Sequence, residues 1–276
     1  MMLSIVIAAF NEEQRIGSTL LRIVEFLAGK GLEYEIIVVD DGSVDGTKET
    51  LTALRPTIPN LSIIHYEVNR GKGYALRAGV LASHGDMVLV TDADLSTPIG
   101  ELEKLASPIL AGECEAAIGS RALALSELIR KQSCWRQGMG RVFNRIVRLM
   151  VLEGFFDTQC GFKAFTGDVA RELFGESKVN RFAYDVEILA LARQKGYRVI
   201  EMPIAWINSP DSRVNPIADP LQMLCDLCRI RLRLGKCGAS GASQETIHSD
   251  RSVSALCDTS KFANFPSLNG RGPEGG

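Results

Sequence analysis

The sequence lacks the features that mark several special classes of protein. No stretch of about 18 uninterrupted apolar residues occurs, so no transmembrane helix is expected. The apolar run in residues 1–10 is too short to span a bilayer, and no basic segment precedes it, so no secretory leader is expected. The formal net charge of −2 shows no basic excess, and nucleic acid is therefore not expected as a partner.

Histidine is scarce and cysteine is unpatterned. The three histidines show no ligand spacing, and the seven cysteines are scattered in an odd number, which indicates free thiols in a reducing compartment. Cys225 and Cys228 form a CxxC pair, but no second pair or nearby histidine completes a zinc site. Because both lie in a helical pattern, we expect simple packing and not a zinc site.

What the sequence does contain is an alternation of strand-like and helix-like segments. Buried strands are expected at residues 3–9, 35–39, 61–66, 115–119 and 198–204 and in a run that begins at 88, with helices at about 16–27, 47–54, 74–83, 102–110, 183–195 and 220–234. Asn11 is expected to cap the first helix, with Glu12 and Glu13 in its first turn. Short connections between alternating elements predict an α/β fold with a parallel, doubly wound sheet and helices on both faces.

The stretch Val88–Leu95 carries two carboxylates, Asp92 and Asp94, directly after an apolar run. Side chains two residues apart on a strand point the same way, so both are expected side by side at the carboxyl end of a central strand. A hard cation such as Mg²⁺ takes one or two carboxylates and fills its other positions with water and phosphate oxygens. This pattern predicts a metal-assisted diphosphate site, and the simpler alternative is a polar turn.

The segment 121–150 is strongly basic. It holds seven Lys or Arg residues and one acid, interleaved with apolar residues. This pattern suits an anionic membrane surface or an anionic acceptor, or else a solvated helix whose apolar side packs on the core. Periodicity is lost near the C-terminus, and residues 236–276 are expected to form a disordered tail.

Eight short motifs, taken in order, resemble a known family. Residues 9–13, 39–43, 69–73, 92–95 and 119–121 have the order and spacing of family-two glycosyltransferases of the GT-A fold. Residues 157–163 (DTQCGFK), 184–187 (YDVE) and 211–213 (DSR) are similar to dolichyl-phosphate β-glucosyltransferases and their polyprenyl-phosphate relatives. The resemblance implies a GT-A domain over residues 1–235, with a nucleotide-sugar half at 1–121 and an acceptor half at 122–235.

The resemblance also implies roles for particular residues. The nucleotide-sugar pocket would be formed by Ala8, Phe10, Glu12, Asp40, Asp41, Lys72, Asp92, Ala93, Asp94 and Arg121. Asp92 and Asp94 would hold Mg²⁺ or Mn²⁺. The acceptor would be bound by Arg130, Lys131, Gln159 and Arg213, and the catalytic residues would be Asp94 and Asp185, the latter as a base or as an acceptor-orienting group.

The activity that the resemblance implies is metal-dependent, inverting transfer of glucose from UDP-glucose to a polyprenyl or dolichyl phosphate. The enzyme would act peripherally on the cytoplasmic face of a membrane. GDP-mannose is the main alternative donor, and a sugar nucleotidyltransferase or a non-catalytic nucleotide-binding adaptor are further alternatives. Ala8 stands where many relatives have Pro, Phe10 where they have Tyr, and DSR at 211–213 where Gly-Ser-Lys is usual, which leaves the sugar and acceptor open.

Several residues of these motifs also have an alternative explanation in which their role is purely structural. Asp40 and Asp41 are suited to forming a turn, and Lys72 and Arg121 to being solvated charges. Asp185 is suited to the first turn of a helix, where the helix dipole favours a carboxylate. Glu187 is suited to an ordinary helix surface.

Overall fold

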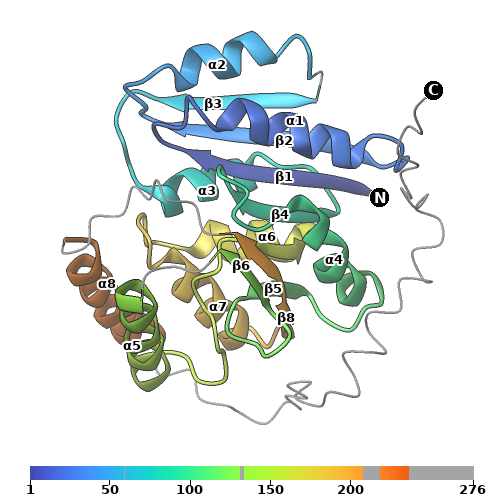
Figure 1. Ribbon diagram of the computed structural model, residues 1–276. Coiled ribbons are helices and arrows are strands. Elements are labelled where there is room, and N and C mark those ends of the chain that lie inside the picture. Colours follow the sequence, from blue (N-terminus) through green and yellow to red (C-terminus); the bar gives the residue numbers. More distant parts are fainter. Residues whose placement is uncertain (59, 131–133, 208–217, 236–276) are drawn as a thin grey trace.

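A seven-stranded sheet forms the centre of the protein in a computed structural model that describes residues 1–58, 60–130, 134–207 and 218–235 (Figure 1). Its strands are β1 (Met2–Ala9), β2 (Glu33–Asp41), β3 (Leu61–Tyr66), β4 (Met87–Asp92), β5 (Ala116–Ser120), β7 (Lys163–Thr166) and β8 (Val199–Pro203). They lie in the order β3-β2-β1-β4-β7-β5-β8. The expected tail at 236–276 lies outside the described residues.

The sheet is mostly parallel, as predicted. β1 pairs in parallel with both β2 and β4, and Ala8 of β1 stands opposite Val39 and Asp92. The central strands are rich in Val and Ile and are buried on both faces, which is typical of a sheet covered by helices. One strand departs from this pattern, because β7 runs antiparallel between β4 and β5.

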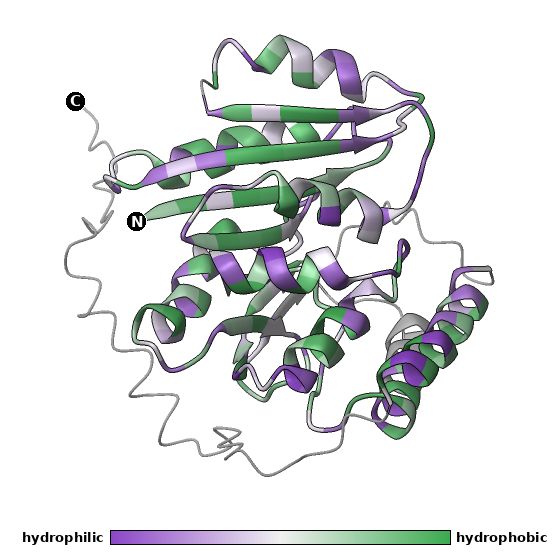
Figure 2. Cartoon of the chain, turned by 180° about the vertical axis from the view of Figure 1, so that it is seen from behind, coloured by the Kyte–Doolittle hydropathy of each residue, from purple (hydrophilic) through white to green (hydrophobic). Residues whose placement is uncertain are grey.

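Helices cover both faces of this sheet, which confirms the predicted fold class (Figure 2). One core packs α1 (Ile16–Leu27), α2 (Thr47–Leu54) and α4 (Leu102–Leu110), which follows the short η1 (Ile99–Glu101), against one face. The other core packs α3 (Lys72–Leu81), α6 (Gly167–Glu176) and α7 (Tyr184–Gln194) against the opposite face. The apolar residues of α1 recur every three or four positions, so a single side of this helix is buried.

Two further helices, α5 (Cys134–Met150) and α8 (Ala218–Leu234), lie side by side at one edge of the molecule, away from β1–β3 (Figures 1 and 2). The basic segment therefore forms the short strand β6 (Glu127–Arg130) followed by α5. β6 pairs in parallel with β9 (Ala205–Ile207), which directly follows β8, the strand expected at 198–204. Among the described helices, none combines the length and apolar character needed to cross a bilayer.

The expected cap of the first helix is wrong. α1 begins only at Ile16, and Arg15 is its N-cap residue. Asn11 instead adopts a left-handed backbone conformation with a φ of 56°, and its side-chain oxygen accepts a hydrogen bond of 2.9 Å from the Val44 amide. Asn tolerates this conformation well, and here it ties the loop after β1 to the loop after β2.

The expected packing of Cys225 and Cys228 is also wrong, since both are exposed free thiols on α8. Their spacing of three residues places them on the same side of this helix. Met223 and Leu227 occupy the side of α8 that packs on the protein.

Candidate active site

Asp92 ends the central strand β4 and pairs with a lysine from the neighbouring helix. Its Oδ1 forms an ion pair with Lys72 Nζ, and the Asp92 side chain remains 37% exposed, so a ligand can reach it. Burial acts to raise the pKa of Asp92, but the charge and hydrogen bond of Lys72, together with the charges of Lys163 and Arg121, hold that pKa below the usual value. Lys72 begins α3 directly after Gly71, whose φ of 103° turns the chain into the helix.

Asp94 reaches this region by a different route from the predicted one. β4 ends at Asp92, so strand alternation does not align Asp94 with it, and Asp94 lies in the following turn. Its Oδ1 accepts a 2.9 Å hydrogen bond from the Ser96 amide. Leu95 has a φ of 44°, a strained conformation for a non-glycine residue. Burial favours the neutral form of Lys72, but the charges of Asp92, Asp185 and Asp94 raise its pKa overall. The Lys72 ammonium group therefore interacts electrostatically with all three carboxylates.

Gly161, in the loop before β7, lies directly against Asp92. A Cβ atom at position 161 would stand 2.3 Å from Asp92 Oδ2 and 2.6 Å from its Cγ, far inside van der Waals contact. Only glycine therefore allows the loop at 157–162 to close over the end of β4. Burial raises the pKa of the neighbouring Cys160 thiol to about 11, so this cysteine is protonated and unreactive at neutral pH.

Lys163 and Asp185 form a buried ion pair beneath this loop. Their side chains are 1% and 6% exposed, and Lys163 Nζ also donates to the Cys160 carbonyl oxygen. Burial raises the pKa of Asp185 despite the nearby charges of Lys163 and Lys72. Asp185 lies in the first turn of α7, as predicted, but its carboxylate already binds Lys163.

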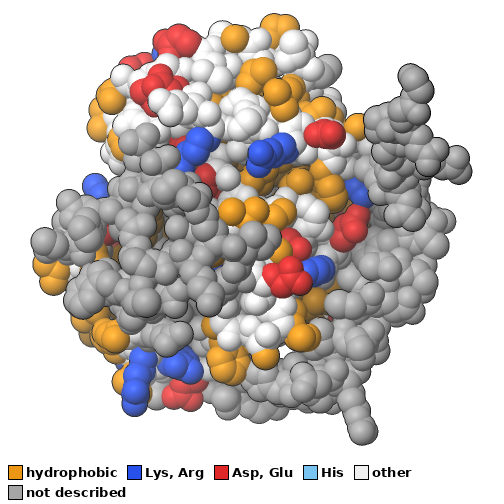
Figure 3. Space-filling model, viewed as in Figure 1, with side chains coloured by type: hydrophobic (Ala, Val, Ile, Leu, Met, Phe, Trp, Pro, Cys, Tyr) orange, Lys and Arg blue, Asp and Glu red, His pale blue; other side chains and the backbone are white. Residues whose placement is uncertain are grey.

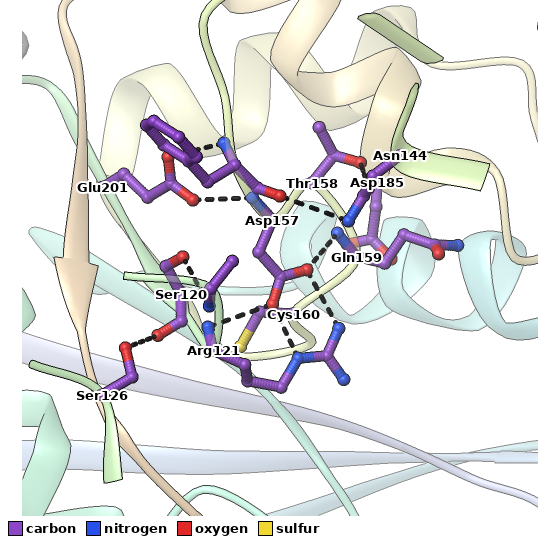
Figure 4. A network of polar contacts seen from close by, with 12 residues as sticks. Ser120, Arg121, Ser126, Asn144, Asp157, Thr158, Gln159, Cys160, Asp185 and Glu201 are labelled. Carbon is purple, nitrogen blue, oxygen red and sulfur yellow. Dashed lines mark hydrogen bonds and ion pairs between the residues drawn. The ribbon is translucent and has the colours of Figure 1, made fainter. Parts of the chain in front are cut away.

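Arg121 makes a two-pronged ion pair with Asp157 (Figure 4). Its Nε lies 2.6 Å from Asp157 Oδ2 and its Nη2 lies 2.9 Å from Oδ1, while its guanidinium also stacks 5.5 Å from the Trp206 ring centroid. Burial acts against ionisation of Asp157, yet the Arg121 charge lowers its pKa. Glu201 holds this loop by accepting hydrogen bonds of 2.9 and 2.7 Å from the amides of Phe156 and Asp157. Arg121 is thus a held cation and not a freely solvated one.

Asp40 and Asp41 are buried at the end of β2 and stabilise the surrounding loops. Asp41 accepts hydrogen bonds of 2.8 Å from the Arg70 amide and 2.7 Å from the Gly71 amide, which orders the loop that leads to Lys72. Asp40 accepts from the Ser43 amide at 3.1 Å and lies 2.9 Å from His65 Nδ1. The structural explanation for these residues is therefore correct, and their contact with a base stays a prediction.

The other predicted nucleotide-sugar residues lie along the same edge of the sheet. Ala8 and Phe10 are half-buried at the end of β1, and Ala8 stands beside Asp92. Glu12 follows them, and its carboxylate pairs with Arg15 at 2.7 Å. Ala93 is buried, and its carbonyl oxygen accepts a 2.6 Å hydrogen bond from Thr19 Oγ1.

The predicted acceptor residues are only partly described. Gln159 is half-buried, and its backbone N–H donates a hydrogen bond of 3.2 Å to Asp157 Oδ1. Arg130 is the last residue of β6, while Lys131 and Arg213 lie outside the described residues. The acceptor contacts therefore stay predictions.

Sequence reasoning missed three residues of this site, namely Asp157, Gly161 and Lys163. All three lie inside the 157–163 motif without an assigned role. One signal was available, namely Lys163 at the start of a short apolar strand. A lysine buried with such a strand needs a charged partner, since an unpaired lysine is almost never fully buried.

Comparison with known proteins identifies the family. Residues 4–174 match the family described as Glycosyl transferase family 2. The chain is 35% identical over 242 residues to a dolichyl-phosphate beta-glucosyltransferase of Dictyostelium discoideum, covering 84% of this chain and 74% of that protein. It is 34% identical over 243 residues to the Homo sapiens protein of the same name, covering 84% and 75%.

Solved structures support the fold. Glucosyl-3-phosphoglycerate synthase from Mycobacterium tuberculosis in complex with Mn²⁺, uridine-diphosphate and glucosyl-3-phosphoglycerate matches with a TM-score of 0.63 at 20% identity, covering 87% of this chain and 82% of that one. The same enzyme with Mg²⁺ and uridine-diphosphate matches with a TM-score of 0.64 at 19% identity, covering 87% and 81%. The ordered motifs, the mixed sheet and these relatives together place the chain in glycosyl transferase family 2, as an enzyme of the GT-A fold.

Proposed function

We propose that this protein transfers glucose from UDP-glucose to the phosphate of dolichol or another polyprenol, with inversion at the anomeric carbon. The observation that carries this proposal is the convergence of Lys72, Asp92 and the Gly161 loop at the carboxyl end of β4, where open α/β sheets bind their ligands. The relatives named dolichyl-phosphate beta-glucosyltransferase favour glucose as the sugar over mannose from GDP-mannose.

A divalent cation, Mg²⁺ or Mn²⁺, fits this site through its oxygen donors. The chemistry of Asp94 suits such an ion, because Asp94 Oδ1 is held by the Ser96 amide and its carboxylate faces no ion-pair partner among the described residues. Asp92 shares its charge with Lys72, so the protein offers one or two carboxylates, as Mg²⁺ commonly uses. In the described part of the chain, no group of three or more His, Cys, Asp or Glu side chains is placed so that it could hold a metal ion, so water and diphosphate oxygens would complete the coordination. When bound, the cation stabilises negative charge on the diphosphate.

The protein's own cations would assist departure of the nucleoside diphosphate. Lys72 lies against Asp92, and Arg121 is held by Asp157 with 30% of its side chain exposed, so both are oriented before substrate arrives. The acceptor phosphate is already anionic at neutral pH and attacks without a strong base. Because Asp185 is buried against Lys163, we infer that Asp185 acts by holding Lys163 in place and does not remove a proton.

We further propose that α5 and α8 rest on the membrane that carries the lipid acceptor. Val142 and Leu149 of α5 are 60% and 68% exposed, and Leu221 and Leu232 of α8 are 60% and 87% exposed. Figure 3 has Lys or Arg side chains beside hydrophobic ones at its lower left, over the region of α5 in Figure 1. Exposed apolar residues flanked by arginines suit the interface of an anionic bilayer, and the cytoplasmic face is the proposed side.

The test is release of free UDP from UDP-glucose, measured with and without polyprenyl phosphate in detergent or liposomes. We expect UDP release only when the lipid phosphate is present, and little or no release of GDP when GDP-mannose replaces UDP-glucose. Asp94→Asn should lower kcat by roughly 10²-fold, because it removes a carboxylate that would hold the cation beside the departing diphosphate.

A matched control is Asp168→Asn, which removes a fully exposed carboxylate on α6 and should leave the rate unchanged. Equal UDP release without lipid, or lipid-dependent release of GDP from GDP-mannose with no release of UDP from UDP-glucose, would contradict the proposed reaction. Full activity of Asp94→Asn would contradict the proposal that a divalent cation bound by Asp94 takes part in the reaction.

A further inference from the structure

A cavity opens between α7, α8 and the segment 178–181, beside the site described above. Its volume is about 320 Å³. Five of the eleven residues that line it are cationic and two are acidic, so its lining carries three net positive charges. None of the residue roles proposed above accounts for this concentration of charge.

The two carboxylates in this cavity are already neutralised. Glu187 is fully buried, pairs with Arg233 and accepts hydrogen bonds from the amides of Lys178 and Val179 at 2.8–3.0 Å. Asp226 pairs with Arg229 at 2.8 Å. The earlier alternative that Glu187 is an ordinary surface residue is therefore wrong.

Three cations remain after these pairs are set aside, namely Arg70, Lys178 and Arg181. No carboxylate in the described ranges forms an ion pair with Lys178 or Arg181, and both side chains are exposed. Arg70 stacks 4.9 Å from the Tyr74 ring centroid and donates to its hydroxyl at 2.7 Å, which leaves its positive charge uncompensated. A cavity with excess positive charge and free donors selects an anion, and a phosphomonoester carries nearly two charges and three acceptor oxygens.

The position of the cavity on α8 indicates where such an anion would come from. Gln222, Asp226, Arg229 and Arg233 recur every three or four residues and line the cavity. Leu221, Cys225, Cys228 and Leu232 recur in the same way and form the neighbouring, exposed apolar stripe. A lipid surface that covered this stripe would bring its headgroups to the rim of the cavity.

The wall of the cavity also contacts the loop that presents Lys72. The Asn180 carbonyl oxygen accepts a 3.0 Å hydrogen bond from the Tyr74 amide in α3. The same oxygen would lie 2.5 Å from a Cβ at Gly71, so the two segments meet without space for a side chain. An anion held by Lys178 and Arg181 would therefore order the segment against which the Lys72 loop packs.

We propose that this cavity binds a phosphomonoester group presented at a lipid surface. Lys178 and Arg181 grip its oxygens, and the exposed stripe of α8 lies on the bilayer beside it. This site rests on the proposed membrane-surface function and extends it, since it gives the protein a lipid-phosphate contact separate from the donor pocket.

The test is co-sedimentation of the full chain with phosphatidylcholine vesicles that contain either phosphatidic acid, a monoester, or phosphatidylglycerol, a diester, matched for surface charge. We expect stronger binding to phosphatidic acid. The double variant Lys178→Gln/Arg181→Gln should weaken that binding about 25-fold, from roughly fivefold for each cation near an anionic surface. Lys48→Gln/Arg55→Gln, which removes two exposed cations at and just after α2, is the matched control and should bind as the wild type does.

The source of the phosphate is tested by titration with soluble glycerol 3-phosphate. If glycerol 3-phosphate binds the wild type but not the double variant, a free phosphomonoester is a ligand of the cavity. If the protein binds only vesicles, the ligand is the lipid headgroup. Both results support the cavity as the binding site. Equal binding by wild type and double variant, or an equal loss on both anionic lipids, would overturn it. Neither measurement needs nucleotide sugar or turnover, so failure of glucosyl transfer and failure of this site are distinguishable.

Discussion

The contact between Gly161 and Asp92 leads to the sharpest prediction. In Gly161→Ala the new Cβ would stand 2.3 Å from Asp92 Oδ2, whereas real Cβ atoms keep at least 3.0 Å from other heavy atoms, so the carboxylate or the loop must move by about 0.7 Å. Such a shift disturbs the Lys72–Asp92 pair. Misplacement of a reacting group by about 1 Å costs roughly 10² in rate, or about 2.7 kcal/mol of transition-state stabilisation.

The assay is kcat for lipid-dependent UDP release, measured with saturating UDP-glucose and polyprenyl phosphate. Overpacking costs about 1–3 kcal/mol of stability, so circular dichroism at the assay temperature must first establish that the variant is folded. Gly100→Ala is the control, because the nearest atom to its new Cβ is Phe26 Cε2 at 3.9 Å. If folded Gly161→Ala keeps kcat within twofold of the wild type, the reasoning that Asp92 must hold its position is refuted.

Two further changes test the buried ion pairs. Asp157→Asn should destabilise the protein by about 2 kcal/mol, less than for a fully buried pair because Arg121 is 30% exposed. The pKa of Asp157 is lowered in the folded state, so the pair stabilises the protein above the unfolded pKa of about 3.9 and this stabilisation is lost as the pH falls through the lower folded value. Urea denaturation should therefore give a difference between variant and wild type at pH 7 that shrinks towards pH 3, and a constant difference would contradict the assignment. Glu187→Gln removes the charge that pairs with Arg233, so hydrogen exchange measured by mass spectrometry should show faster exchange of the α8 amides. Glu172→Gln, which changes an exposed side chain on α6, should leave that exchange unchanged.

Local patterns were sufficient to predict most of the fold. Runs of Val and Ile identified the buried parallel strands, because strands covered on both faces lack polar alternation. The antiparallel direction of β7 was not predictable, since a four-residue strand carries little signal and its partners β4 and β5 are distant in sequence. Asn11 failed as a predicted cap because its side chain binds Val44 of another loop instead of the helix that follows.

The site was predictable where it depends on parallel strands alone. Asp92 and Lys72 meet because the carboxyl ends of such strands, and the helices after them, share one edge of the sheet. The argument that strand alternation places Asp94 beside Asp92 was wrong, because β4 ends at Asp92 and a turn follows. Asp157 was missed because its role depends on a distant arginine, and no local spacing signals such a pair.

The antiparallel strand β7 has a consequence for any attempt to build hybrid enzymes. β4 and β5 come from the amino-terminal half of the chain, yet each is hydrogen-bonded to β7, which is supplied by the carboxyl-terminal half. A fragment cut after residue 121 would leave one edge of β4 and both edges of β5 unpaired, because β5 also pairs with β8, and it would be prone to aggregate. The two halves of the chain thus share a single sheet, so chimeras between relatives must exchange β7 and its preceding loop along with the segment they are meant to transplant.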